Sequence, residues 1–256
     1  MKQGIRLFFI ATALCATCIS CGKKKIPDPI LPPIETHFTK DTLGYEMENK
    51  SKVYAIISID SPVDLDELSN KNFSMWVSTV LERECSTDKD AVNSLAKAFV
   101  TTASANLRNT YTTLDKESKR TIKELYTKVD INKIYEDQKY VTYLFEEEIF
   151  DGGSHPMRKS IGYTFNRMDF SLADLIQPEE TETYSRQITE ELGKTMVSDP
   201  SKLMNLLLID EKHKEQNLVP LPANGAYLVG DSLIFKYQEY EIASYNFGFP
   251  TVILSR

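Results

Sequence analysis

Hydrophobic residues recur along this 256-residue chain with two different spacings, which separate expected strands from expected helices. Over residues 52–60 apolar side chains occupy both faces of an alternating run, which is typical of a strand inside a sheet. From Tyr140 apolar and polar residues alternate, and a second such run covers residues 161–165, so the pair is expected to form a β-hairpin. Three shorter runs near the end of the chain are also predicted strands: residues 227–229, 233–237 and 251–254.

Between the first strand and the hairpin the apolar spacing lengthens to three and four residues, which predicts amphipathic helices. Ser69 is the expected N-cap of the first helix. Thr87 and Asp90 resemble a capping box at the start of the second helix. A third helix is expected from Asp115. Its predicted inner face consists of Ile122, Leu125, Tyr126 and Val129.

The second half of the chain mixes both kinds of element. We expect a short helical turn over residues 172–176, a helix over 184–196 and, after Pro200, a further element over 202–209. Strands and helices come in clusters, without a regular alternation of single strands and single helices. The sequence therefore predicts an α+β fold, with a mainly antiparallel sheet packed against several amphipathic helices.

The start of the chain has the pattern of a bacterial lipoprotein signal peptide. Lys2 and Arg6 supply positive charge, residues 7–19 carry none, and the small Ser20 precedes Cys21, as signal peptidase II requires. The uncharged run is too short to remain as a membrane-spanning anchor. We expect cleavage before Cys21 and attachment of several acyl chains, palmitate among them, which hold the protein permanently on a membrane. The alternative is an ordinary secretory signal that is cut elsewhere.

The expected organisation has four parts: a signal peptide at residues 1–20, a proline-rich tether at 21–50, an N-terminal α+β part at 51–139 and a C-terminal domain at 140–256. Prolines crowd the beginning of the tether and favour an extended conformation, which holds the folded body away from the bilayer.

Charge and cysteine content narrow the classes of function. Asp and Glu number 37 against 30 Lys and Arg, a net charge of -7, and no basic patch interrupts this excess. We therefore expect no nucleic acid partner, and favour neutral glycans or basic proteins as partners.

The cysteines leave one free thiol in the processed protein. Cys15 and Cys18 would be removed with the signal peptide and Cys21 would be acylated, so Cys85 is the one free thiol. Its place on a helical apolar stripe predicts a buried structural thiol.

Motifs for metal binding and catalysis are absent from the sequence. The three histidines, His37, His155 and His213, lie far apart, and no zinc, calcium, phosphate-loop or serine-elbow motif occurs. We expect no metal and no cofactor. One acidic run lies near the end of the strand that begins at Tyr140: Glu146, Glu147, Glu148 and Asp151. Such a run could supply two carboxylates for glycosidic chemistry, but it is more typical of solvated protection against edge pairing.

Two other stretches resemble a known family. Residues 152–156 read Gly-Gly-Ser-His-Pro, and residues 240–248 read Tyr-Glu-Ile-Ala-Ser-Tyr-Asn-Phe-Gly. With the Asp-Phe-Ser-Leu-Ala-Asp-Leu-Ile element within residues 166–176, they resemble the RsiV-like extracytoplasmic domain family, although Ser154 stands where Ala is usual. This family, largely of unknown function, occurs in lysozyme-sensing anti-sigma factors and beside PdaC-type polysaccharide deacetylase domains.

The resemblance implies a binding module. The chain lacks a sigma-binding segment with a transmembrane helix and lacks a deacetylase metal triad, so neither of those activities follows. We expect a noncatalytic, lipid-anchored protein of the cell envelope, on the outer membrane and facing the periplasm or the cell surface. It would recognise peptidoglycan, another glycan, or an envelope protein such as lysozyme. The alternatives are an envelope hydrolase that uses His155 with Glu241 or Asp151, and a purely structural scaffold.

The expected ligand or partner contacts lie in the loop and the tail: Gly152, Gly153, His155, Tyr240, Glu241 and Tyr245. The glycines permit positive φ, and Pro156 holds His155 in an extended conformation that projects the imidazole. A structural hydrogen bond to a neighbouring strand and a general acid or base role remain open for His155. Glu241 is flanked by apolar side chains, so backbone N–H groups or His155 should satisfy it. We therefore predict that loop and tail meet.

Overall fold

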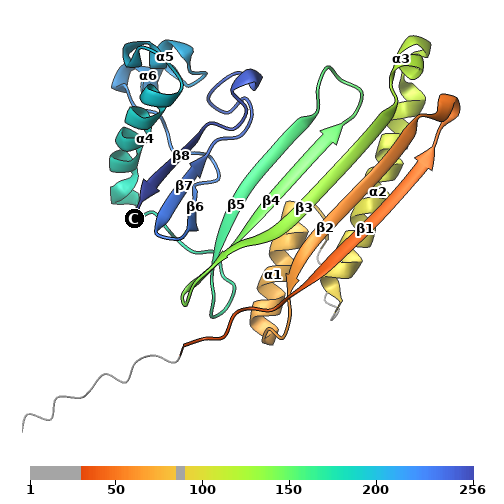
Figure 1. Cartoon of the computed structure of the whole chain (residues 1–256), viewed down its shortest axis with the longest axis horizontal. Helices are drawn as coiled ribbons and strands as arrows, with labels where there is room; N and C mark the ends of the chain where they lie inside the picture. The colour runs from red at the N-terminus through yellow and green to blue at the C-terminus, as the bar shows by residue number, and fades with distance from the viewer. Residues whose placement is uncertain (1–29, 85–89) are drawn as a thin grey trace, which may run out of the picture. The chain divides into compact units, whose positions relative to one another are not determined.

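The computed structural model describes residues 30–84 and 90–256, and residues Pro32–Arg256 form one compact unit (Figure 1). Within the described residues this unit contains eight strands in two sheets and six α-helices, which confirms the predicted α+β class. The predicted signal peptide, Cys21, Thr87 and Cys85 lie outside the described residues. A search of the described helices finds none with the length and hydropathy needed to cross a bilayer.

The larger sheet has five strands in sequence order. These strands are β1 (Thr36–Glu46), β2 (Lys52–Pro62), β3 (Glu124–Glu136), β4 (Tyr140–Phe150) and β5 (Met157–Asn166). All neighbours pair antiparallel except β2 and β3, which are parallel. The connection between these two carries α1 (Glu67–Val80), α2 (Ala91–Thr113) and α3 (Lys116–Thr121). In Figure 1, α1 and α2 cover one face of the sheet, and the main core lies between them and that face.

The first helix begins three residues earlier than the sequence predicts. Asp66 is its cap, and its carboxylate accepts hydrogen bonds from the N–H groups of Leu68 and Ser69 at 2.9 and 3.0 Å. Ser69 was the expected cap, but it is buried within the helix, where its hydroxyl donates back to Asp66 at 2.6 Å. The Asp66 carboxylate, placed just before the first turn, accepts from two free N–H groups of that turn, whereas a hydroxyl within the helix cannot reach them.

The predicted third helix is wrong over most of its length, because α3 ends at Thr121 and β3 begins at Glu124. Leu125, Tyr126 and Val129 therefore lie on a central strand. A strand buried on both faces carries apolar residues at consecutive as well as alternate positions, and a short stretch of it mimics helical spacing.

Two further expectations need correction. Part of the range predicted as tether forms β1, an edge strand whose side chains are mostly exposed and polar, so its sequence shows no apolar alternation. The helical turn expected over residues 172–176 is absent, and Leu172 instead forms an isolated β-bridge with Phe165. Backbone pairing along the end of β5 replaces local helical bonds there.

The remaining elements form a smaller layer with its own core. Antiparallel strands β6 (Ala226–Val229), β7 (Ser232–Lys236) and β8 (Thr251–Ser255) confirm the three predicted short strands. The helices are α4 (Thr181–Thr195), which confirms the helix expected over 184–196, and the short α5 (Leu203–Leu206) and α6 (Glu211–Gln216). Four 3-10 turns complete the description: Glu48–Lys50, Pro178–Glu180, Pro200–Lys202 and Tyr245–Phe247. The predicted boundary at residue 140 falls between β3 and β4, inside the larger sheet.

The two sheets meet on the face of β4 and β5 that points away from the helices. The Thr142 hydroxyl donates to the Leu228 carbonyl at 2.7 Å, and the Leu228 N–H donates to the Thr164 hydroxyl at 2.9 Å. Beside these buried bonds Tyr227 packs directly on Gly162, where an added Cβ would lie 2.1 Å from the ring. Close contact between the sheets therefore depends on a residue without a side chain.

Replacing Gly162 by Ala should destabilise the protein, because the methyl group overlaps the Tyr227 ring and β6 must shift away from β5. The expected loss is about 3 kcal/mol of unfolding free energy, at the upper end for overpacked cores. Urea unfolding followed by circular dichroism measures it. Gly153→Ala is the matched control, because its Cβ would meet nothing closer than 3.6 Å. Equal stability of both variants would contradict the proposed packing.

Candidate functional site

The glycine-containing loop and the C-terminal tail meet in space, as predicted. The His155 ring stacks on Tyr245 with ring centroids 3.7 Å apart and an interplanar angle of 22°. Its Nε2 lies 3.2 Å from the Tyr240 hydroxyl. These three residues, here called the aromatic cluster, come from the connection between β4 and β5 and from the segment after β7.

The two nitrogens of His155 have neutral partners. Nδ1 lies 3.0 Å from the Pro156 carbonyl, which can only accept, so this nitrogen carries a proton. In the neutral ring Nε2 is then an acceptor, and the Tyr240 hydroxyl donates to it. Among the described residues no carboxylate bonds to this imidazole, so the His–carboxylate pair that the hydrolase alternative needs is not assembled here.

Glu241 holds the tail in shape. Its carboxylate accepts hydrogen bonds from the N–H groups of Ala223 and Gln238, at 2.6 and 2.7 Å. The prediction that backbone N–H groups satisfy it is therefore confirmed, whereas His155 is not its partner. The preceding residue, Tyr240, has a φ of 65°, which is uncommon for a bulky side chain. The bonds to Glu241 hold this turn closed and leave the Tyr240 side chain 54% exposed.

The two loop glycines have different surroundings. Gly152 has a φ of 100° and faces inward, where an added Cβ would lie 2.9 Å from Ile122 Cδ1 and close to Leu125. Gly153 is exposed at the surface. Of the six predicted contact residues, Gly152 and Glu241 thus serve the packing and the turn, while Gly153 and the aromatic cluster lie where a ligand can reach them.

Arg158 continues the aromatic cluster toward the sheet. Its guanidinium carbon lies 5.5 Å from the centre of the Tyr245 ring and 5.6 Å from that of Phe249. On Phe249, in turn, the Lys236 ammonium lies at 5.0 Å. Rings and cations thus alternate from His155 to Lys236 in a continuous stack, and each such contact contributes roughly 0.5 to 2 kcal/mol. Burial lowers the pKa of the Lys236 ammonium, which also donates to the Ser160 hydroxyl.

Side chains of the tail cover the free edge of β5. Glu239 accepts from the Arg158 Nε at 2.8 Å and from its backbone N–H at 3.2 Å. The Gln238 amide pairs with both backbone groups of Ser160, each at 2.9 Å. These bonds replace a sixth strand, protect the edge from other chains and fix the position of Arg158. No sequence motif predicts these bonds, because they depend on the register between β5 and the tail, which lie far apart in the sequence.

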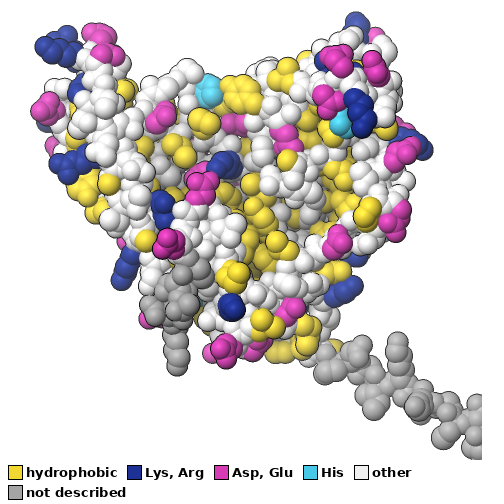
Figure 2. All heavy atoms as spheres, turned by 180° about the vertical axis from the view of Figure 1, so that it is seen from behind, with side chains coloured by type: hydrophobic (Ala, Val, Ile, Leu, Met, Phe, Trp, Pro, Cys, Tyr) yellow, Lys and Arg dark blue, Asp and Glu magenta, His cyan; other side chains and the backbone are white. Residues whose placement is uncertain are grey.

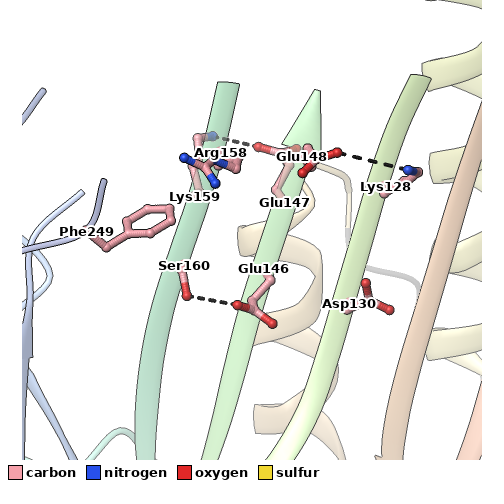
Figure 3. Close-up of a pocket in the computed structure, with 9 residues that line it drawn as sticks. All are labelled: Lys128, Asp130, Glu146, Glu147, Glu148, Arg158, Lys159, Ser160 and Phe249. Carbon is pink, nitrogen blue, oxygen red and sulfur yellow. Dashed lines mark hydrogen bonds and ion pairs between the residues drawn. The ribbon is translucent and has the colours of Figure 1, made fainter. Parts of the chain in front are cut away.

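An open groove of about 360 Å³ lies beside this stack, on the sheet face opposite α1 and α2 (Figure 3). Lys128, Glu148 and Arg158 form one row across β3, β4 and β5, and Phe249 points toward β5 from the tail. The full lining is Lys128, Asp130, Glu146, Glu147, Glu148, Arg158, Lys159, Ser160 and Phe249.

Charged side chains line the groove. Lys128 lies 4.0 Å from Glu148 on the groove face, whereas Lys159 contacts Glu147 at 3.1 Å on the helix face of β4 and β5. Glu148 also accepts from the Tyr126 hydroxyl at 2.6 Å, and burial together with this bond raises the Tyr126 pKa. The expected role of this acidic run in protecting a sheet edge is wrong, because β4 is a central strand. Its glutamates instead alternate with cations on the neighbouring strands.

A search for groups of three or more His, Cys, Asp or Glu side chains able to hold a metal finds none in residues 30–84 and 90–256.

Together the fold and the groove define a mixed α+β protein with an open polar groove beside stacked rings. Residues 173–256 match the family model DUF3298, described as a protein of unknown function. This match includes the whole tail and every strand of the smaller sheet. No curated protein matches the sequence.

Two solved structures share the fold. A DUF3298 family member from Bacteroides fragilis has a TM-score of 0.61 and 13% sequence identity, with 87% of this chain and 91% of that chain covered. A DUF3298 family protein from Pseudomonas aeruginosa has a TM-score of 0.56 and 12% identity, with 88% and 91% covered. At these identities the likeness establishes the architecture alone.

Replacing Arg158 by Met should lower stability, because the Glu239 carboxylate, with a side chain only 5% exposed, loses its charged partner. The expected cost is about 2 kcal/mol. Urea unfolding at neutral pH gives the value. Lys194→Met removes a cation from an exposed pair with Glu191 and serves as the control, with a change below about 0.5 kcal/mol. A smaller effect at Arg158 than at Lys194 would refute this account.

Proposed function

We propose that this protein is a noncatalytic, lipid-anchored binding module of the cell envelope, and that it recognises a glycan through its uncharged sugar rings, as in the glycan strands of peptidoglycan. The aromatic cluster and the adjoining groove form the binding surface. The RsiV-like resemblance of the loop and tail supports a recognition role, and the DUF3298 match over residues 173–256 is compatible with it.

The observation that carries the proposal is the meeting of three stacked rings with an open polar groove. Sugars present apolar C–H faces and a rim of hydroxyl groups, so they bind where an aromatic face adjoins fixed hydrogen-bonding groups. Tyr240 offers an exposed ring, and the groove offers carboxylate, amine and hydroxyl groups. Arg158 and the bonds of the tail hold these groups in place before a ligand arrives, which reduces the entropy lost on binding.

The charge distribution favours a ligand without net charge. The two cations on the groove face, Lys128 and Arg158, each lie within 4.0 Å of a carboxylate, so neither offers an unmatched positive charge. The chain as a whole carries a charge of -7, which repels polyanions. A neutral polysaccharide avoids this repulsion and uses the paired groups as hydrogen-bond donors and acceptors.

The proposed location follows from the sequence around Cys21. Acyl chains on this cysteine would hold the protein on the outer membrane, facing the periplasm or the cell surface. The proline-rich residues that follow would act as the tether between the acyl chains and the folded unit, which begins at Pro32.

Binding of a glycan should depend on the aromatic cluster. In titration calorimetry of the full-length protein with N-acetylglucosamine oligomers, Tyr245→Ala should weaken binding at least about tenfold, or 1.4 kcal/mol, because it removes the central ring of the stack. Pull-down with purified sacculi should show the same loss.

Tyr45→Ala is the matched control, because Tyr45 is an exposed tyrosine on β1, at the other edge of the sheet. Its binding should equal that of the unchanged protein. If neither sacculi nor oligomers bind, or if Tyr245→Ala binds as well as Tyr45→Ala, the glycan proposal is wrong. Saturable binding of the basic protein lysozyme without any glycan binding would favour the protein ligand instead.

Lipid attachment should require Cys21 alone. Cells grown with radiolabelled palmitate should incorporate label into the unchanged protein and into Cys85→Ser, whereas Cys21→Ser should contain none and should leave the detergent fraction. The reason is that acylation occurs on the cysteine that follows the cleavage site. Label retained by Cys21→Ser would show that the anchor is elsewhere.

A further inference from the structure

Exposed apolar side chains gather at one end of the larger sheet, at the lower end of the molecule in Figure 2. β1 and β4 start at this end, while β2, β3 and β5 finish there, and α1 begins there (Figure 1). Met168 is 74% exposed and Leu68 is 55% exposed. The entry face, as we call it, comprises five exposed apolar residues: Phe38, Leu68, Ile134, Met168 and Leu172.

The folded unit receives its N-terminal segment at this same end. The Arg167 guanidinium donates to the Pro32 carbonyl and pairs with Glu136 at 2.8 Å. Glu136 accepts from the Ile34 N–H at 2.8 Å, and the Lys133 ammonium donates to the Ile34 carbonyl. The Arg167 and Glu136 side chains are largely buried, so this network fixes the point at which the chain enters the body.

The entry face surrounds that network. Met168 follows Arg167 directly, and its carbonyl lies 3.4 Å from the Ser69 hydroxyl, one residue after Leu68. The Asn72 amide donates to the Asp169 carbonyl at 2.8 Å, which holds the loop against α1. Ile134 follows Lys133, at the irregularity in the β3–β4 pairing. Exposed apolar side chains grouped in this way are typical of an interaction surface.

We propose that the entry face rests on the lipid surface to which the protein is anchored, with Met168 and Leu68 in contact with the interface of a zwitterionic bilayer. This inference rests on the lipid anchor of the proposed function. Cys21 precedes Pro32 by eleven residues, a span of roughly 34 Å in a polyproline conformation. The acyl chains would be joined to the body at the entry end, so this end lies nearer the anchor along the chain than the groove end does.

Acidic groups select the kind of lipid. Asp66 and Asp169 lie beside Leu68 and Met168, and both are ionised at neutral pH. The Ser69 hydroxyl holds the pKa of Asp66 below its usual range, and the Ser171 N–H does the same for Asp169. Glu67 adds a third negative charge at the start of α1. These three charges repel anionic headgroups beside Leu68 and Met168, so the contact at these two side chains fits zwitterionic lipid.

The arrangement directs the groove away from the bilayer. Along β4, Glu148 is eight residues from Tyr140, a separation of roughly 26 Å at the rise of a strand. Met157, at the start of β5 and 66% exposed, lies at the groove end and provides a comparison for Met168 at the entry end.

The test uses the full-length lipoprotein with Cys85→Ser in phosphatidylcholine vesicles. Met168→Cys and Met157→Cys are each labelled with the environment-sensitive dye NBD, and flotation confirms that both proteins are anchored. We expect a blue-shifted emission and at least twofold quenching by nitroxide-labelled lipids for the dye at position 168, and neither effect at position 157. Adding phosphatidylglycerol should reduce the quenching at position 168.

Several outcomes would overturn the inference. Equal and weak quenching at both positions in floated protein would refute the entry face while leaving the anchor intact. Stronger quenching at position 157 would reverse the orientation. Failure of both proteins to float would refute the lipid anchor, and with it this inference. A further variant, Met168→Glu with the dye attached at Leu172→Cys, should show reduced quenching with an unchanged circular dichroism spectrum.

Discussion

Contact between the two sheets depends on the missing side chain of Gly162. Tyr227 occupies the space above this glycine, and the hydroxyl groups of Thr142 and Thr164 join the backbone of Leu228 beside it. This joint brings the segment after β7 alongside β5, where Gln238 and Glu239 replace a missing strand. The stack from His155 to Lys236 and the wall of the groove exist only because that segment is held there. The geometry of the site therefore depends on the packing between the two sheets.

Most of the fold follows from local pattern, and the failures share one cause. In the hairpin from Tyr140, apolar side chains alternate with threonine, glutamate and glycine, so its two strands are visible in the sequence. β3 is buried on both faces, and residues from Leu125 to Val129 therefore match a helix as well as a strand. β1 is an exposed edge strand with no apolar face, so it resembles a tether. Both strands are defined by their neighbours, which a local pattern does not contain.

The same distinction applies to the site. The sequence indicates the loop around His155 and the tail around Tyr245, because glycine, proline and clustered aromatic residues mark them. Arg158, Glu239 and Phe249 were missed, although they join the loop to the groove. Arg158 reads as an ordinary charged position on an alternating strand, and its role comes from the register that sets Glu239 opposite it. Glu241 was predicted to be satisfied by backbone N–H groups or by His155, since an unpaired buried carboxylate is costly, and the backbone is its partner.

The entry of the chain beside Arg167 has a mechanical consequence. β1 starts two residues after Ile34 and pairs with β2 along its full length of 11 residues. If the anchor is held and a polymer pulls at the opposite end of the sheet, the tension runs parallel to the strands. All backbone hydrogen bonds between β1 and β2 then carry the load together in shear. A pull perpendicular to the strands would instead break these bonds one after another. This geometry suits a domain that must stay folded under mechanical tension.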